Sequence, residues 1–322
     1  MWAKLMSHAD VFEDVVHLPS ARVQTEYDRL VGLDEYKERL VKETLLLLDP
    51  DLLSEWDRRC HGGTLAAIDY FQSRPPLFVL AGDVGTGKSA LARSFGNEVA
   101  KRARAPIHLY ALSLNARGSG AVGEMTRLIS GAFQQARGAV ANTRGGGNKA
   151  GRGVILLIDE ADALAQSREA AQMHHEDRAG VNALIRGIDE IAAERLPIAV
   201  IMCTNRLGAI DPAVRRRAAA VFEFHRPNRR QRVHVLREAL RGSGLAESEL
   251  EALADATGNN RERAYGYTYS DLTQRLVPSI VLDAFPDRPI VGSRAIDIAR
   301  STVPTPPFGV AGDADREENH HG

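Results

Sequence analysis

Short apolar runs alternate with amphipathic segments through the first two-thirds of the chain. Apolar residues at helical spacing, as in residues 34–48 and 128–136, predict helices between those runs. Strands that alternate with helices favour a parallel sheet covered on both faces, which is an α/β fold. The runs rich in Val, Ile, Leu and aromatic residues that predict buried strands are residues 77–81, 107–112, 154–158, 198–203 and 221–225.

The pattern changes after about residue 226. Residues 228–239, 247–257 and 269–284 have helical periodicity without any strand signal between them, which predicts a small all-α domain. The end of the chain is rich in proline and then acidic, as in disordered segments. The predicted division is a short N-terminal extension (1–26), a large α/β domain (27–226), a helical domain (227–301) and a disordered tail (302–322).

Composition adds limits to this picture. The formal net charge of −1 provides no overall field that would attract nucleic acid or an anionic membrane. The two cysteines, Cys60 and Cys203, have no disulfide pattern and favour a reducing compartment. No apolar run approaches the roughly 18 residues of a membrane span, and acidic residues interrupt the first 16 residues. We therefore expect a cytoplasmic protein without membrane segments.

The segment between the first predicted strand and its following helix matches the motif G-x-x-x-x-G-K-[ST]. In such a loop, consecutive backbone N–H groups and the helix N-terminus surround phosphate oxygens. Lys88 is then placed to reach the β- and γ-phosphates, and the Ser89 hydroxyl can ligate Mg²⁺. All fixed positions are present in their expected context, which argues against a glycine-rich turn with a chance lysine. The predicted nucleotide-binding residues are Gly82, Asp83, Val84, Gly85, Thr86, Gly87, Lys88, Ser89 and Ala90.

Two later strands end in polar residues, and ligands bind at the carboxyl ends of strands in an open parallel sheet. Asp159 ends one apolar run and fits a ligand of Mg²⁺ or its water, and Glu160 is placed to deprotonate a water. The alternative is an acidic pair favoured by a helix N-terminus. Asn205 ends the next strand and can hold the attacking water or contact the γ-phosphate, although asparagine is also a common turn residue.

Three consecutive arginines, Arg215 to Arg217, follow a short segment that begins at Ile210. Adjacent residues on a helix cannot all face one direction. One interpretation is a solvated basic face or a nucleic-acid patch. The other is an arginine finger, which a neighbouring subunit would supply to the γ-phosphate. The residues alone leave these interpretations open.

Together these motifs resemble the AAA+ ATPases. VGLDEYKERL resembles the family's opening segment, GDVGTGKS and VILLIDEAD its Walker A and B motifs, CTNR its sensor 1, and IDPAVRRRAAAVFEF its arginine-finger segment. The resemblance implies a five-stranded parallel sheet of order 5-1-4-3-2 with an α-helical lid domain. It also implies ATP and Mg²⁺ as ligands, a homohexamer, adenine binding by the backbone of Val31 and Gly32, and arginine fingers at Arg216 and Arg217.

A closer resemblance lies between the second and third of these motifs. The segment DEADALAQSREAAQMHHEDRAGVNALIRGIDEI, and the later QRLVPSIVLDAF, are similar to the pachytene-checkpoint AAA+ proteins that remodel HORMA-domain proteins. Bacterial relatives occur in CBASS antiphage systems beside a HORMA protein and a CD-NTase. The resemblance implies a remodeller that disassembles the HORMA–synthase complex and restrains second-messenger signalling.

Three features depart from the family pattern. Eukaryotic relatives carry a separate N-terminal recognition domain, whereas about 26 residues precede the predicted ATPase core here, so we expect the substrate to contact the ring surface, the pore or that short extension. The pore loop falls on Ala121, Val122, Gly123 and Glu124, so that alanine replaces the family's aromatic residue. The sensor-2 arginine has no clear counterpart, with Ser270 or Asp271 at its place and Arg275 nearby.

Other motifs and functions remain as alternatives. His174 and His175 point about 100° apart on a helix and make a poor pair of metal ligands. Residues 142–153 resemble an arginine–glycine RNA-binding segment but fit a solvated loop. The alternative functions are a remodeller of another AAA+ branch, Rubisco-activase-like or protease-linked, and a nucleic-acid loader. The near-neutral charge disfavours the loader.

Overall fold

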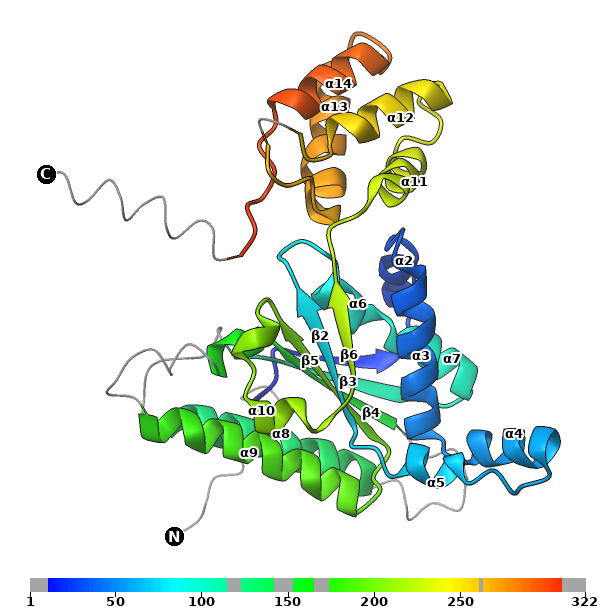
Figure 1. The fold of residues 1–322 in the computed structure, drawn as a ribbon, viewed down its shortest axis with the longest axis vertical. Coiled ribbons are helices and arrows are strands. Elements are labelled where there is room, and N and C mark those ends of the chain that lie inside the picture. The colour runs from blue at the N-terminus through cyan, green and yellow to red at the C-terminus, as the bar shows by residue number, and fades with distance from the viewer. Residues whose placement is uncertain (1–10, 115–122, 142–152, 165–173, 261–262, 309–322) are drawn as a thin grey trace, which may run out of the picture. The chain divides into compact units, whose positions relative to one another are not determined.

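The computed structural model of this chain describes residues 11–114, 123–141, 153–164, 174–260 and 263–308. The chain divides into two compact units, each of which is built from separate stretches of sequence (Figure 1). The first unit comprises Met1–Arg29, Glu35–Ala81 and Ser89–Glu223, and the second comprises Leu30–Asp34, Gly82–Lys88 and Phe224–Gly322.

The first unit is built on a six-stranded sheet with the order β1-β3-β4-β5-β2-β6. The pairs β2–β5, β4–β5 and β3–β4 are parallel, as predicted for an α/β protein. The five predicted strands have the predicted order 5-1-4-3-2, which corresponds to β6-β2-β5-β4-β3. The strands are β1 (Asp14–Leu18), β2 (Leu77–Gly82), β3 (Ile107–Ser113), β4 (Gly153–Asp159), β5 (Ile198–Thr204) and β6 (Ala218–Phe224).

The sixth strand, β1, corrects the prediction of a five-stranded, wholly parallel sheet. It pairs antiparallel with β3, from Asp14 opposite Ala111 to Leu18 opposite Ile107. Its sequence, DVVHL, contains two β-branched residues, but it is only five residues long and stands alone in a polar stretch. Leu18, at the end of this strand, is buried, with 3% of its surface exposed.

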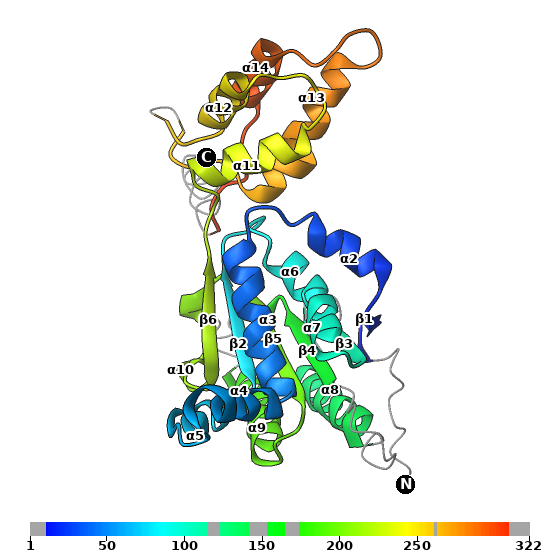
Figure 2. The ribbon, with the colours of Figure 1, turned by 90° about the vertical axis from the view of Figure 1, so that its right-hand side faces the viewer.

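Helices cover both faces of the sheet (Figures 1 and 2). On one face, α8 and α9 pack with Leu156 and Ile158 of β4 in a single large apolar cluster. On the other face, α7 approaches so closely that a Cβ at Gly96 would lie 2.7 Å from a methyl group of Ile155. The helices of this unit are α2 (Ala21–Asp28), α3 (Asp34–Leu48), α4 (Asp51–His61), α5 (Ala67–Gln72), α6 (Lys88–Ser94), α7 (Gly96–Ala103), α8 (Glu124–Ala141), α9 (His174–Ala193) and α10 (Pro212–Arg215).

The second unit contains the predicted helical domain. It holds α11 (Arg229–Ala239), α12 (Glu247–Ala256), α13 (Val277–Ala284) and α14 (Gly292–Ser301). A π-helical turn, Asp271–Leu276, runs directly into α13. Pro278 lies at the start of α13 and has no N–H to donate to an earlier carbonyl, which accounts for the wider turn before it. This unit also contains the loop Gly82–Lys88.

Candidate nucleotide site

The loop Gly82–Lys88 joins strand β2 to helix α6, as the motif predicts. Gly82 has a φ of 146°, and a Cβ there would lie 2.1 Å from the carbonyl oxygen of Phe224. Gly85 has a φ of 75°, and a Cβ there would lie 2.6 Å from the Thr268 hydroxyl. Only glycine fits these two positions, because both the backbone conformation and the space exclude a side chain.

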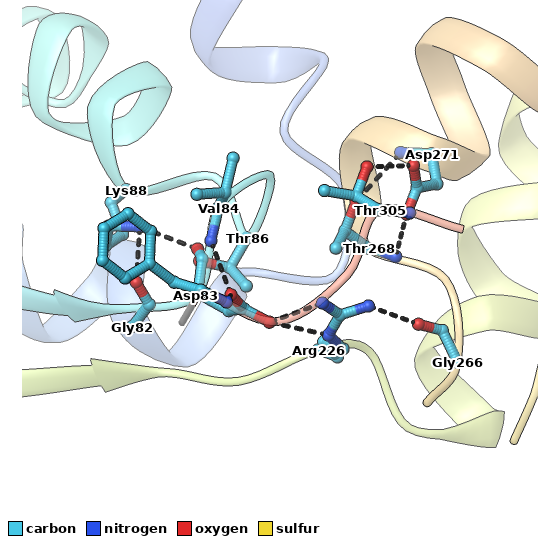
Figure 3. Close-up of polar contacts among 11 residues, drawn as sticks. Gly82, Asp83, Val84, Thr86, Lys88, Arg226, Gly266, Thr268, Asp271 and Thr305 are labelled. Carbon is cyan, nitrogen blue, oxygen red and sulfur yellow. Dashed lines mark hydrogen bonds and ion pairs between the residues drawn. The ribbon is translucent and has the colours of Figure 1, made fainter. Parts of the chain in front are cut away.

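Lys88 is held across this loop (Figure 3). Its ammonium group is buried and donates 2.8 Å hydrogen bonds to the carbonyl oxygens of Gly82 and Asp83. The Thr86 hydroxyl donates to the same Asp83 carbonyl at 2.7 Å. Val84 is exposed at the tip of the loop. The loop therefore carries its positive charge inside the turn, where backbone donors and the ammonium can bind an anion together.

The second unit also contains the predicted adenine-binding backbone. Gly32 has a φ of 82°, and its carbonyl oxygen accepts hydrogen bonds from the Tyr269 hydroxyl at 3.1 Å and the Gln231 amide at 3.2 Å. Val31 precedes it in the same turn and is half-buried. Two side chains from the helical part of the second unit, Tyr269 and Gln231, therefore hold the turn at Gly32.

The three sensor-2 candidates have different environments. The Ser270 N–H donates to the Gly85 carbonyl of the phosphate loop at 3.1 Å. Asp271 is 1% exposed and accepts from the Thr268 N–H at 2.9 Å, and Arg275 donates to Asp271 at 3.0 Å. Burial opposes ionisation of Asp271, but its hydrogen bonds outweigh burial and lower its pKa. Of the three, Ser270 is the residue that contacts the loop.

The first unit contains the predicted metal ligands. The Ser89 hydroxyl donates to Oδ1 of Asp159 at 2.9 Å, so α6 and β4 bring these two oxygens together. Asp159 is 6% exposed and also accepts from the backbone N–H of Glu160 at 3.0 Å. A hydroxyl and a carboxylate are hard oxygen ligands of the kind that Mg²⁺ prefers. The donor set therefore fits a magnesium ion.

Arg93 is a neighbour of Asp159 that the sequence analysis does not identify. Its guanidinium lies 3.4 Å from Oδ2 of Asp159 and 2.8 Å from the Glu13 carboxylate. Burial works against the charged form of Arg93, but the two carboxylates outweigh burial and raise its pKa. Arg93 therefore contacts the oxygen of the Asp159 carboxylate that Ser89 does not contact.

Glu160 occupies a strained position directly after strand β4. Its φ is 56°, a left-handed conformation that costs a non-glycine residue of the order of 1–3 kcal/mol. Its side chain is exposed, and Oε2 accepts a 2.7 Å hydrogen bond from the Ser113 hydroxyl. Ser113 ends β3, where it lies opposite Asp159 in the register. Ser113 of the neighbouring strand therefore orients the carboxylate of Glu160, which the sequence predicts to be the general base.

Asp162 organises the end of strand β5. It is 5% exposed and accepts from the Thr204 hydroxyl at 2.5 Å and from the Asn205 side-chain amide at 3.0 Å. The backbone N–H groups of Asn205 and Arg206 also donate to it, at 2.9 and 3.1 Å. The predicted sensor residue, Asn205, is therefore oriented by a buried carboxylate just beyond Asp159 and Glu160.

The two predicted arginine fingers differ in their contacts. Arg217 donates to both carboxylate oxygens of Asp189 in α9, at 2.7 and 2.9 Å. This bidentate pair raises the pKa of Arg217. The Arg216 side chain is exposed and makes no ion pair with any described residue. Arg216 is therefore the residue of the pair that can extend away from its own chain.

The remaining predictions concern segments that are only partly described. Ala121 and Val122 of the predicted pore loop lie outside the described residues. Gly123 has a φ of 78°, and Glu124 begins α8. His174 and His175 begin α9, but their side chains lie outside the description. Among the described residues no cluster of three His, Cys, Asp or Glu could bind a metal, and no helix has the length and apolarity to cross a membrane.

Comparison with known proteins agrees with this fold. Residues 78–226 match the ATPase family associated with various cellular activities (AAA). The chain is 50% identical over 299 residues to CD-NTase-associated protein 6 from Escherichia coli (strain MS 115-1), covering 93% of this chain and 96% of the relative. The chain therefore belongs to the AAA ATPase family, whose members bind nucleotides and hydrolyse ATP.

Solved structures extend the comparison. A chain of the E. coli MS115-1 HORMA:CdnC:Trip13 complex is 50% identical, with a TM-score of 0.86, and the match covers 94% of this chain and 99% of that one. Rhizobiales Trip13 is 44% identical, with a TM-score of 0.73, and the match covers 92% of this chain and all of that one. The predicted resemblance to bacterial relatives of the pachytene-checkpoint ATPases is therefore confirmed.

The site includes residues that sequence reasoning did not assign. Asp162 is the third acidic residue of the DEAD segment, and that clustering could have identified it. Ser113 ends a predicted strand one position beyond the apolar run, as other site residues do. No sequence motif marks Arg93. Its contact with Asp159 exists because α6 packs beside β4 in the folded chain.

Proposed function

We propose that this chain is an ATP-driven remodeller that acts as a homohexamer on a HORMA-domain protein bound to a CD-NTase. The observation that carries this proposal is the 50% identity, over nearly the whole chain, to a chain of a HORMA:CdnC:Trip13 complex. In a CBASS system, such an activity would disassemble the HORMA–synthase complex and restrain synthesis of the second messenger.

ATP binding depends on the phosphate loop and on Ser89 and Asp159. Backbone N–H groups between Gly85 and Ser89 and the Lys88 ammonium bind the phosphates. Ser89 and Asp159 would hold Mg²⁺, with Asp159 acting directly or through water. When bound, that ion supplies charge neutralisation at the phosphates. The 2.9 Å contact between Ser89 and Asp159 supports this assignment.

Hydrolysis uses groups at the ends of neighbouring strands. Glu160 takes a proton from the attacking water, and the Ser113 hydroxyl at 2.7 Å sets the direction of its carboxylate. Asn205, oriented by Asp162, holds that water or the γ-phosphate. Arg216 of the adjacent subunit neutralises charge that develops on the γ-phosphate. Its exposure supports action in trans.

The arginines give little support to the nucleic-acid alternative. Arg102 pairs with Glu38 and Glu98, and Arg229 pairs with Asp255. Guanidinium groups that are already paired with carboxylates contribute less to phosphate binding, because binding would break those pairs. We therefore favour a protein substrate.

The test uses the purified chain with a HORMA protein and the CD-NTase encoded beside it. We expect ATP turnover that rises with the HORMA protein, and ATP-dependent loss of the HORMA–synthase complex on a sizing column. The Glu160→Gln variant is the matched control, since it should retain the complex. Absence of turnover, or a complex that persists with ATP, would contradict the proposal.

A further inference from the structure

The last described residues of the chain are held by residues 267–271 of the second unit. We call residues 302–308 the C-terminal strap; they fall within the segment predicted to be disordered. The Thr302 carbonyl accepts from the buried Tyr267 hydroxyl at 2.8 Å, and Pro304 is buried. Thr305 donates twice to Asp271, from its hydroxyl at 2.7 Å and its N–H at 3.1 Å (Figure 3). The strap is therefore fastened at defined points.

Asp271 makes this fastening specific. It is 1% exposed and holds both the turn at Thr268 and the strap at Thr305. Its lowered pKa means that the carboxylate is ionised at neutral pH, which strengthens each hydrogen bond that it accepts. A buried carboxylate with these partners holds the chain as it leaves α14.

The strap continues to the phosphate loop. The Phe308 N–H donates to Oδ1 of Asp83 at 2.9 Å. The Arg226 guanidinium donates to Oδ2 of Asp83 at 2.8 and 2.5 Å, and to the Gly266 carbonyl at 2.7 Å (Figure 3). The side chains of Asp83 and Arg226 are 18% and 15% exposed. All these residues belong to the same compact unit.

The position of Asp83 raises a problem of charge. It is the second residue of a loop whose purpose is to bind an anion, and its carbonyl oxygen already contacts Lys88 and Thr86. A carboxylate there opposes an incoming polyphosphate, because like charges repel strongly at a partly buried site. Arg226 and the Phe308 N–H offset this charge, and they hold the carboxylate by hydrogen bonds to its two oxygens.

We propose that Arg226 and the backbone N–H of Phe308 are positioning groups for nucleotide binding, which hold the Asp83 carboxylate away from the phosphate path. The C-terminal strap would thereby link residues 302–308 to the affinity of the phosphate loop. The proposal rests on the proposed function, since it concerns the same nucleotide.

The first test separates the backbone N–H of Phe308 from its ring. Phe308→Pro removes one of the two backbone donors to Oδ1 of Asp83, since the Val84 N–H also donates to it at 3.0 Å, and Phe308→Ala keeps both. We expect Phe308→Pro to raise the KM for ATP and the Kd for Mg²⁺-ATP about tenfold, near the lower end of the effect of one lost hydrogen bond to a charged acceptor. The kcat at saturating ATP should stay within twofold, and Phe308→Ala should match the wild type. Equal values for both variants, or a fall in kcat alone, would overturn the proposal.

The second test addresses charge and does not depend on the fold of the strap. Arg226→Met leaves Asp83 unpaired and should weaken Mg²⁺-ATP binding about 10- to 100-fold by calorimetry. In an Asp83→Asn background, the same Arg226→Met change should cost less than threefold. An equal loss of affinity in both backgrounds would show that Arg226 acts independently of Asp83, for example through its hydrogen bond to the Gly266 carbonyl, and would overturn the proposal. Failure of the wild type to bind ATP would instead contradict the proposed function.

Discussion

The Ser113 hydroxyl donates a 2.7 Å hydrogen bond to Oε2 of Glu160, across the gap between the ends of strands β3 and β4. Glu160 also has a φ of 56°, so its backbone is strained. A carboxylate that is held by a neighbouring strand is coupled to any movement of that strand. Along the chain, β3 is followed by the predicted pore loop, residues 121–124.

Replacement of Glu160 tests its role as the base. Glu160→Gln keeps the shape of the side chain but cannot take a proton from water. We expect kcat for ATP to fall at least 10²-fold, while the Kd for Mg²⁺-ATP changes less than threefold, since Ser89 and Asp159 remain. The measurement is a phosphate-release assay beside a calorimetric titration. Turnover at the wild-type rate would refute this assignment of Glu160.

Replacement of Ser113 tests the positioning of that base. Ser113→Ala removes the donor and leaves Glu160 free to rotate, so we expect basal kcat to change by about 3- to 10-fold in either direction with little effect on the KM for ATP. Ser113→Thr keeps a hydroxyl and is the matched control. A change in KM without a change in kcat would show that Ser113 does not act through Glu160.

Replacement of Lys88 tests the phosphate loop. Lys88 donates to the carbonyl oxygens of Gly82 and Asp83, both at 2.8 Å. Lys88→Ala removes these bonds as well as the charge, and we expect the Kd for Mg²⁺-ATP to rise about 10- to 100-fold. Lys88→Arg is the comparison, because it keeps the charge but not the geometry. Tight ATP binding by Lys88→Ala would refute the role given to Lys88.

The arginine pair offers a comparison within one chain. We expect Arg216→Ala to lower kcat about 10³-fold, the loss of an arginine finger. Arg217→Ala should have a smaller effect, which Asp189→Asn should reproduce, because these two residues form one bidentate pair. Mixing each variant with Glu160→Gln subunits shows whether the defect acts across the interface. Full activity of the Arg216→Ala protein would show that Arg216 is not an arginine finger and belongs to a solvated basic surface.

Asp162 supports a stability prediction. Asp162→Asn places an amide where the structure has an acceptor for Thr204, Asn205 and Arg206. We expect a loss of about 1–3 kcal/mol in the free energy of unfolding, because buried donors lose their partner. ATP turnover should fall together with stability, since Asn205 loses its orientation. Chemical denaturation of Asp162→Asn beside Asn205→Ala, which leaves the backbone donors satisfied, distinguishes the two effects.

Much of the candidate site was predictable because its residues are adjacent to apolar strands. The phosphate loop, Asp159, Glu160 and Asn205 each follow a run of buried residues, so local sequence places them at one end of the sheet. The partners of these residues come from elsewhere in the chain. Ser113 and Arg93 reach Glu160 and Asp159 only after β3 and α6 have packed beside β4.

The ends of the chain were harder to predict, for a different reason. The strand Asp14–Leu18 is too short and isolated to stand out, and it forms because β3 offers an open edge. Residues 302–308 have the composition of a disordered tail, but buried Asp271 supplies a partner for Thr305. In both segments, a distant element determines the local structure.

Strand β1 has a practical consequence for anyone who trims this protein. Val11 and Phe12, just before it, are 0% and 3% exposed and belong to the same apolar cluster as α8 and α9. A shortened chain that starts at residue 27 would remove these side chains and uncover the hydrogen-bonding edge of β3. Unpaired edges of this kind recruit strands from other molecules. Aggregation of such a fragment would then reflect an exposed sheet edge rather than a failure of the ATPase core to fold.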